Sequence, residues 1–336
     1  MNRSSIIVTR YGGPDVLEVI SEPLLAPGRG EIRVKVEASG VALADLMRRE
    51  GLYPLSPEPP FIPGYDAIGI VDAIGPDVEN HKIGDRAAVF FNGVGGYSSH
   101  VIAPAEEAIP VPETLDPAAA VALLLNYVTA YQMLHRIARV SAGDRVLIHG
   151  ASGGVGTALL ELGRLAELEM YGTASAAKRS VVEGYGAVAI DYRSSDFVEV
   201  LEKLAPNGID AVFDPIGGRN WDRSMRTLHN QGTFVGYGYT SVLEPGTEND
   251  WAARWKSLAE SKRTKKGNPV HLYSITSLKR EHPDWFMEDV RHLFTLLSAG
   301  QIQPLISHRI PFQNAAQAHE LLATSRATGK VVLVHS

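Results

Sequence analysis

A glycine-rich turn between a short apolar strand and a helix constrains this chain more than any other feature of its sequence. Residues 146–162 read VLIHGASGGVGTALLEL, so an apolar run leads directly into a turn and then a helix. Glycines there permit a tight reversal, a close backbone approach to a ligand and close packing of the helix on the strand. The free N–H groups at the start of the helix favour an anion. We expect a dinucleotide pyrophosphate to contact Gly150, Ser152, Gly153, Gly154 and Val155; the alternative is a purely structural turn.

The region around this turn alternates strands and helices. Short apolar runs occupy 145–149, 170–173, 187–190, 211–213 and 233–235, with helical stretches at 153–168, 194–204 and 220–228. Repeated strand–helix units of this kind are typical of a parallel sheet with helices on both faces. The sequence therefore predicts the α/β class, with a doubly wound parallel sheet.

The first ~115 residues follow a different pattern, because short strands there are separated by turns. Glu31–Val41 alternates apolar and polar side chains, as a half-buried strand does, and Ala67–Ile74 is a more continuous apolar run. Gly51–Gly64 contains five prolines, which exclude a helix or a central strand. This half is expected to be a mostly β domain, and the proline-rich segment is either a surface loop or a stiff loop that shapes a pocket.

The segment after the second strand of the α/β region bears on the choice of nucleotide. A site that prefers NADH usually has an Asp or Glu here to bind the ribose 2′-hydroxyl. No carboxylate occurs between Met170 and Val182, whereas Lys178 and Arg179 are able to bind a 2′-phosphate. The sequence therefore favours NADPH; the alternative is that both side chains are simply solvated at a helix start.

Composition excludes several classes of protein. The chain has 336 residues, enough for two domains, and a net charge of 32 − 38 = −6, which gives no support to broad nucleic-acid binding. It has no cysteine, so disulfides, cysteine-ligated zinc and a cysteine nucleophile are excluded. No signal peptide is evident in MNRSSIIVTRYGG, and we expect a cytoplasmic protein. The uncharged stretch Pro117–Leu134 is either a buried helix or a membrane span; we expect no stable membrane insertion.

Several motifs occur in the order typical of one family. They are YGGPDVLEV (11–19), SGVALADLMRREGLYP (39–54), PGYDAIGIVDAIG (63–75), NYVTAY (126–131), GASGGVG (150–156), FDPIGG (213–218) and GKVVLV (329–334). Nearly the whole chain thus resembles the medium-chain dehydrogenase/reductase superfamily, and most of all its zinc-free quinone oxidoreductases, which include zeta-crystallin. Residues 270–290 further resemble a subgroup related to the vesicle amine transport protein. The resemblance implies a GroES-like substrate domain (1–125 and 301–336), a Rossmann NADPH-binding domain (126–300) and a homodimer.

The metal ligands of the zinc-containing relatives are missing here. Those relatives have a cysteine within the segment that reads Gly40-Val41-Ala42, a histidine at Tyr65 and a cysteine near Leu125. A metal site is therefore not expected, nor is alcohol oxidation, which uses a Lewis acid. A quinone or a conjugated enone accepts hydride without a metal, and this is the predicted reaction. The alternatives are an alkenal or enoyl double-bond reductase, or a low-turnover NADPH-binding protein that uses the basic residues of 254–280 at a membrane or on RNA.

The resemblance also implies roles for individual residues. Tyr53 matches a tyrosine of the substrate site and is a candidate proton or hydrogen-bond donor. Asp45 matches the aspartate that orients the zinc-binding histidine; since Tyr65 replaces that histidine, we expect an Asp45–Tyr65 hydrogen bond. Many quinone reductases have Asn where Ala42 stands, which puts the quinone preference in doubt. The remaining expected cofactor contacts are Thr129, Ser175, Tyr192, Gly236, Tyr237 and Lys330.

Overall fold

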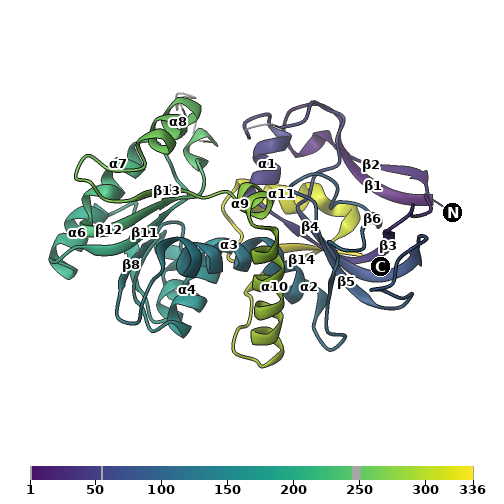
Figure 1. Cartoon of the computed structure of the whole chain (residues 1–336). Coiled ribbons are helices and arrows are strands. Elements are labelled where there is room, and N and C mark those ends of the chain that lie inside the picture. The colour runs from purple at the N-terminus through teal and green to yellow at the C-terminus, as the bar shows by residue number, and fades with distance from the viewer. Residues whose placement is uncertain (1, 54–55, 244–250, 336) are drawn as a thin grey trace. The chain divides into compact units, whose positions relative to one another are not determined.

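The computed structural model describes residues 2–53, 56–243 and 251–335, and the chain forms two compact units (Figure 1). The first unit comprises residues 1–128 and 284–336, and the second comprises 129–283. The domain limits expected from the sequence differ from this division mainly at α10 (Pro283–Ser298), because its residues from Asp284 onward belong to the first unit. The roles assigned to the two domains stay predictions.

The first unit is built on a seven-stranded sheet in the order β14-β15-β3-β4-β5-β7, with β6 also paired to β3. The strands are β3 (Glu31–Val41), β4 (Asp66–Ile74), β5 (Arg86–Phe90), β6 (His100–Pro104), β7 (Ile109–Pro110), β14 (Ile306–Pro311) and β15 (Lys330–Val334). A separate hairpin joins β1 (Asn2–Val8) and β2 (Leu17–Pro23). The alternation predicted for β3 is observed: Ile32, Val34 and Val36 are buried in one apolar cluster, whereas Lys35 is exposed.

The short helix α1 (Leu43–Arg49) directly follows β3 and was not predicted from the sequence. The Asp45 carboxylate accepts a hydrogen bond from the N–H of Ala42 at 2.8 Å, and so satisfies one of the free N–H groups at the helix start. Seven residues with mixed apolar and charged side chains give too short a pattern to recognise. In the same unit, α11 (Ala315–Ala323) lies between β14 and β15 in the chain.

The apolar segment from Pro117 to Ala138 is helical throughout. It consists of α2 (Pro117–Ala122), a π-helical turn (Leu123–Tyr127), α3 (Val128–Tyr131) and a second π-helical stretch (Gln132–Ala138). Its length of 22 residues and the mean hydropathy of 1.3 in its most apolar 18-residue window are sufficient for crossing a membrane, but 78% of that window is buried inside the protein. That degree of burial supports the interpretation as a core helix.

The second unit is the doubly wound parallel sheet that the sequence predicts. Its strand order is β10-β9-β8-β11-β12-β13, and every pair is parallel. The strands are β8 (Arg145–Ile148), β9 (Glu169–Ala174), β10 (Val188–Asp191), β11 (Ile209–Asp214), β12 (Leu228–Gly236) and β13 (Val270–Leu272). The connecting helices are α4 (Gly154–Leu165), α5 (Arg179–Gly184), α6 (Phe197–Leu204) and α7 (Arg219–Arg226); α4 and α7 lie on opposite faces of the sheet (Figure 1).

Helix α8 (Trp251–Ser261) closes the core beside β13. Trp251 and Trp255 pack against the apolar cluster around Trp221, which is fully buried. The helix ends at Ser261. The basic residues that follow form an exposed turn that includes Lys262, Arg263, Lys265 and Lys266.

Candidate active site

Most of the predicted cofactor residues gather at the carboxyl edge of the second unit's sheet. Because the strands are parallel, their carboxyl ends meet at one edge, where doubly wound proteins bind their ligands. The residues that follow these strand ends are Gly150, Ser152, Gly153, Gly154 and Val155 after β8, Ser175 and Lys178 after β9, Tyr192 after β10, and Gly236 and Tyr237 at the end of β12. The sequence thus placed a contiguous set of residues on one edge, although their contacts with a cofactor stay predictions.

The glycine turn has the backbone geometry that a pyrophosphate site needs. Gly150 has a φ of +62°, a conformation that favours glycine, and a Cβ at Gly156 would lie 2.7 Å from the Cα of Ala151. Gly153 is the N-cap of α4, and no side chain caps this helix. The N–H groups of its first turn are therefore left for an external acceptor, and this observation fits a dinucleotide.

A buried polar network includes His149, the residue directly before the glycine turn, and supports that turn. His149 Nδ1 lies 3.0 Å from Thr173 Oγ1, and its Nε2 lies 3.0 Å from the hydroxyl of Ser224. Ser224 donates to the Asp214 carboxylate at 2.6 Å, and the same carboxylate accepts from the N–H of Ile216 at 2.7 Å. Burial lowers the pKa of His149, so its neutral form is favoured. The network links the ends of β8, β9 and β11 to α7, and sequence reasoning missed it because its residues are far apart in the chain.

The two basic residues after β9 differ in their surroundings. Arg179 is exposed and forms an ion pair with Glu183, with its Nε 2.6 Å from the carboxylate. Lys178 is half-buried, and this burial lowers its pKa. A half-buried ammonium gains more from an anion beside it than an exposed guanidinium does, so Lys178 is the better candidate for a 2′-phosphate contact.

The other candidates on this edge differ in exposure. Tyr192 is 54% exposed, and its ring lies 5.7 Å from the guanidinium carbon of Arg193. Tyr237 donates its backbone N–H to the carbonyl of Asp214 at 3.1 Å, and burial raises the pKa of its hydroxyl. A Cβ at Gly236 would lie 2.8 Å from the Trp221 ring, so that position has no room for a larger residue.

Two expected cofactor contacts lie elsewhere. Thr129 is buried in α3 of the second unit. Lys330 begins β15 in the first unit, where it is 3% exposed and its Nζ is 3.5 Å from the amide oxygen of Asn126. A Cβ at Gly40 would lie 2.6 Å from that Nζ, so the glycine makes room for the lysine. Their contacts with a cofactor stay predictions.

In the first unit, the structure brings Tyr53 and Tyr65 together around an arginine that sequence reasoning missed. The guanidinium of Arg48 lies over the Tyr53 ring, with 4.2 Å between its central carbon and the ring centroid. Its Nη2 donates to the hydroxyl of Tyr65 at 3.1 Å. Burial is the largest cause of the raised pKa of Tyr65, and the neighbouring Tyr53 adds to it. The aromatic pair thus forms a cluster with a cation at its centre.

The predicted Asp45–Tyr65 hydrogen bond is wrong. Asp45 Oδ2 accepts from the N–H of Ala42 and from the hydroxyl of Tyr97, the latter at 3.4 Å, and Oδ1 has no partner among the described residues. The reason is local: Asp45 lies in the first turn of α1 and caps it, whereas Arg48, one turn further on, reaches Tyr65. Burial raises the pKa of Asp45 to about 7.

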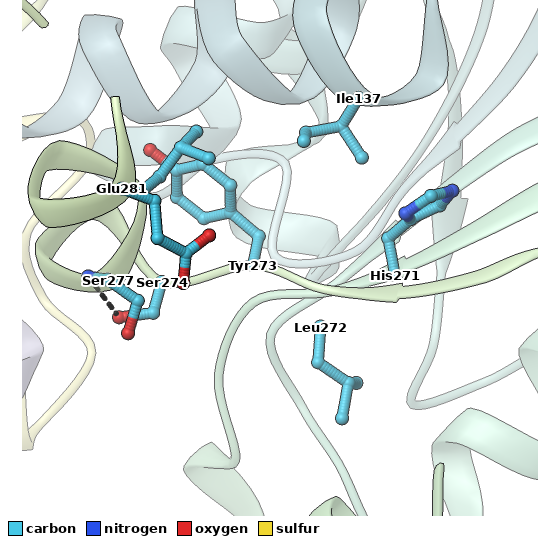
Figure 2. Close-up of a pocket in the computed structure, with 8 residues that line it drawn as sticks. Ile137, His271, Leu272, Tyr273, Ser274, Ser277 and Glu281 are labelled. Atoms are coloured by element: carbon cyan, nitrogen blue, oxygen red, sulfur yellow. Dashed lines mark hydrogen bonds between the residues drawn. The ribbon is translucent and has the colours of Figure 1, made fainter. Parts of the chain in front are cut away.

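Within the described parts of the chain, no group of three or more His, Cys, Asp or Glu side chains is arranged to hold a metal ion. The described residues do enclose a pocket of about 200 Å³ beside the end of β13 (Figure 2). Its lining includes Ile137, His271, Tyr273, Ser274 and Glu281, and burial lowers the pKa of His271. None of the predicted site residues lines this pocket.

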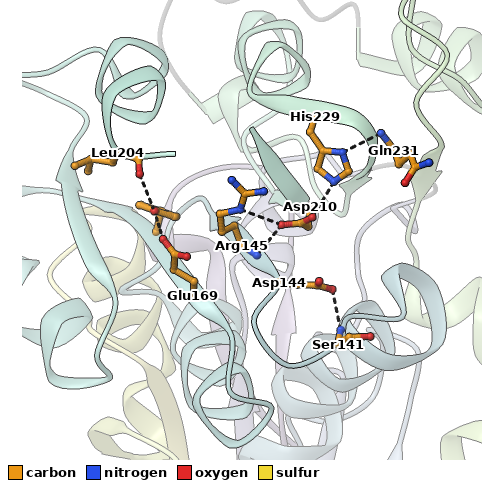
Figure 3. A network of polar contacts seen from close by, with 9 residues as sticks. Ser141, Asp144, Arg145, Glu169, Leu204, Asp210, His229 and Gln231 are labelled. Carbon is orange, nitrogen blue, oxygen red and sulfur yellow. Dashed lines mark hydrogen bonds and ion pairs between the residues drawn. The ribbon is translucent and has the colours of Figure 1, made fainter. Parts of the chain in front are cut away.

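A second polar network lies at the amino ends of the strands of the second unit's sheet and joins neighbouring strands (Figure 3). Asp210 accepts from the backbone N–H of Arg145 at 2.8 Å and from its side-chain Nε at 3.3 Å. Its other oxygen lies 2.8 Å from Nε2 of His229. These contacts join the starts of β8, β11 and β12, so the two edges of the sheet are held by different networks.

Comparison with known proteins places this geometry in a family. Residues 28–113 match the alcohol dehydrogenase GroES-like domain, and residues 185–333 match the zinc-binding dehydrogenase family. The chain is 35% identical to the synaptic vesicle membrane protein VAT-1 homolog of Rattus norvegicus, over 98% of this chain and 83% of that protein. It is 30% identical to the quinone oxidoreductase of Rattus norvegicus, over 98% and 97%.

Comparison with solved structures supports the same family. The Escherichia coli quinone oxidoreductase, determined in complex with NADPH, has a TM-score of 0.86 and 28% identity over 98% of this chain and 99% of that chain. The two units therefore have the expected GroES-like and Rossmann folds. The chain belongs to the medium-chain dehydrogenase/reductase family of oxidoreductases, in its quinone oxidoreductase branch.

Proposed function

We propose that this protein is an NADPH-dependent reductase that transfers hydride to a quinone or a conjugated enone without a metal. The observation that carries the proposal is the uncapped start of α4 at the glycine turn, with Lys178 following the neighbouring strand β9. The N–H groups of α4 bind the pyrophosphate, and Lys178 binds the 2′-phosphate. NADPH, when bound, supplies the hydride.

The acceptor is bound by the Tyr53–Tyr65 cluster of the first unit. A tyrosine hydroxyl donates a hydrogen bond to a carbonyl oxygen and passes on a proton as that oxygen gains charge. Apolar residues or glycine at two of the three zinc-ligand positions, and Tyr65 at the third, favour an acceptor that needs no Lewis acid. An alkenal or enoyl substrate uses the same parts and differs in the atom that receives the hydride.

The first test measures NADPH consumption with 1,4-benzoquinone, 9,10-phenanthrenequinone or a 2-alkenal as the acceptor, and NADPH formation from NADP⁺ with a primary alcohol. Each reaction is measured with and without a chelator. We expect chelator-insensitive turnover of a quinone or of the alkenal, which also decides between the two acceptor classes. Y53F is expected to lower kcat by about tenfold to a hundredfold, because one donor to the acceptor oxygen is lost. Turnover of the alcohol alone, or activity that the chelator abolishes, contradicts the proposal.

A second candidate function is binding to an anionic membrane surface with little turnover. It is favoured by the exposed basic turn after α8, in which Lys262, Arg263, Lys265 and Lys266 have exposed side chains, and by a relative that is named as a synaptic vesicle membrane protein. Clustered cations attract anionic lipid by about 1 kcal/mol each. Cosedimentation with phosphatidylserine vesicles at physiological salt, compared with the charge-reversed variant of these four residues, tests this function. Equal binding by both proteins contradicts it.

We also propose a homodimer formed through β13. This strand pairs with β12 on one side only among the described residues, so its other edge is able to add a strand. Light scattering at several protein concentrations is expected to give twice the mass of the chain. A monomer mass throughout rejects the dimer.

A further inference from the structure

Arg48 is a buried cation with no counter-ion among the described residues. It is 6% exposed, and the described residues place no carboxylate within ion-pair distance of it, whereas its neighbour Arg49 pairs with Glu50. Its Nε is enclosed and has no hydrogen-bond partner among the described residues. Burying a charge that lacks a partner lowers the stability of the folded protein, so a functional reason for Arg48 is expected.

Asp45 compensates this charge only in part. Asp45 feels the electrostatic effect of Arg48, but burial raises its pKa to about 7, which favours its neutral form more than in an exposed aspartate. The groups that do contact the guanidinium are neutral: the Tyr53 ring, the Tyr65 hydroxyl and, at 3.5 Å, the carbonyl oxygen of Asn92. The cluster therefore has a net positive potential beside two tyrosine hydroxyls.

We infer that Arg48, with Tyr65, forms an oxyanion-binding site that stabilises the negative charge produced on the acceptor oxygen during reduction. This inference rests on the proposed function and adds a residue to it. Because an arginine only donates, its hydrogen bond uses a lone pair of the Tyr65 oxygen and leaves the Tyr65 proton to point at another acceptor. Tyr53 is half-buried and lies on the guanidinium, so this side of the cluster has access to solvent.

NADPH, as the reductant, supplies both electrons of the reaction as a hydride. When the conjugated carbon of the acceptor receives hydride, a C–H bond forms there and the π electron pair moves onto the oxygen. The resulting oxyanion accepts hydrogen bonds from Tyr53, Tyr65 and Arg48 and then takes one proton through a tyrosine hydroxyl, which solvent reprotonates, and the nicotinamide is left oxidised as NADP⁺. For a quinone, the product tautomerises to the hydroquinone. A preorganised cation in a site of low dielectric stabilises such charge far more than water does.

The first experiment measures charge preference without turnover. The probe is 4-nitrophenol, whose phenolate resembles the oxyanion and whose ionisation is followed by absorbance in the presence of the protein. We expect the wild-type protein to bind the phenolate about tenfold more tightly than the phenol, so the apparent pKa of the bound probe falls by about one unit. R48M is expected to abolish this preference, and R48K to retain part of it because the charge remains. R33M is the matched control, because Arg33 is a partly buried arginine of the same unit that pairs with Asp72.

The second experiment uses steady-state kinetics with the acceptor that the panel identifies. Loss of Arg48 in R48M is expected to lower kcat by about a hundredfold with little change in KM, since the charge exists only in the transition state. A change in KM alone indicates recognition of a charged ground state and overturns the inference. An unchanged probe pKa in a folded R48M or R48K also overturns it. If no acceptor is turned over while the probe still responds to Arg48, the proposed function fails and the anion site stands.

Discussion

Nη1 of Arg49 lies 3.1 Å from Nδ1 of His319, and both groups are buried. Because an arginine is always a donor, Nδ1 must accept, and the proton of the neutral imidazole is on Nε2. That nitrogen lies 3.2 Å from the hydroxyl of Tyr97, which in turn donates to Asp45. The hydrogen bonds thus run in one direction, from Arg49 through His319 and Tyr97 to Asp45.

This direction makes His319 a site of acid sensitivity. Protonation of Nδ1 would place two donors face to face, and burial with the nearby Arg49 charge lowers the pKa of His319 to about 3. The unfolded chain binds this proton near pH 6.5, so the contribution to stability is complete above that pH and is lost as the pH falls toward 3. Between pH 7 and pH 5 we expect His319 to account for about 2 kcal/mol of the loss in unfolding free energy. Urea unfolding of H319Q at both pH values is expected to show a smaller decrease than the wild type; an equal decrease contradicts this assignment.

Asp45 contributes to the free energy of unfolding with the opposite pH dependence to His319. Burial raises its pKa to about 7 from the ordinary value of 3.8, so the folded protein holds a proton that the unfolded chain releases. The contribution of Asp45 to the free energy of unfolding is complete below pH 3.8 and is lost as the pH rises through 7. We expect D45N, which keeps an oxygen acceptor for Ala42 and Tyr97, to gain about 3 kcal/mol relative to the wild type between pH 5 and pH 8. D72N, at the partner of Arg33, is the control and is expected to show no such trend.

Lys178 is expected to determine the choice of nucleotide. A charged hydrogen bond to the 2′-phosphate contributes ~2 kcal/mol, so K178A is expected to lower the NADPH-to-NADH ratio of kcat/KM by at least about tenfold. R179A is the matched control: Arg179 is the next residue and already pairs with Glu183, so the ratio is expected to change little. Equal ratios for K178A and the wild type contradict the assignment, and a larger effect of R179A transfers the role to Arg179.

Close packing at the start of α4 is expected to make Gly156 sensitive to a single methyl group. In G156A the new Cβ would meet the backbone of Ala151 at 2.7 Å, which forces the helix away from the turn. We expect a loss of ~1–3 kcal/mol in unfolding free energy and weaker NADPH binding, measured by urea unfolding and by fluorescence titration. In contrast, G184A places its methyl group in open space at the end of α5, and we expect unchanged or slightly higher stability with unchanged NADPH binding.

Local patterns predicted the α/β half of this protein well. The glycine turn, the strand–helix alternation and the edge that carries Ser175, Tyr192 and Gly236 all follow from short segments read in order. They were predictable because the carboxyl ends of parallel strands must share an edge, whatever their order in the sheet. Sequence position therefore determines on which edge a residue lies.

Contacts between distant segments were not predictable in this way. The partner of Tyr65 is Arg48 because α1 turns that side chain toward β4, and a helix of seven residues leaves too weak a pattern to show this. His319 joins Arg49 across 270 positions of the chain. The hydrogen bond expected between Asp45 and Tyr65 was wrong for the same reason, since the resemblance indicated a shared site without the rotation of the helix within it.

The position of β15 in the first sheet has a consequence for how the protein is made. This strand, Lys330–Val334, follows the whole second unit in sequence and lies between β14 and β3, so it is an interior strand of the sheet. On the ribosome, the contiguous second unit is able to fold while the first unit still lacks an inner strand. The first unit is therefore begun before the second unit and completed after it, once residues 330–334 have left the exit tunnel.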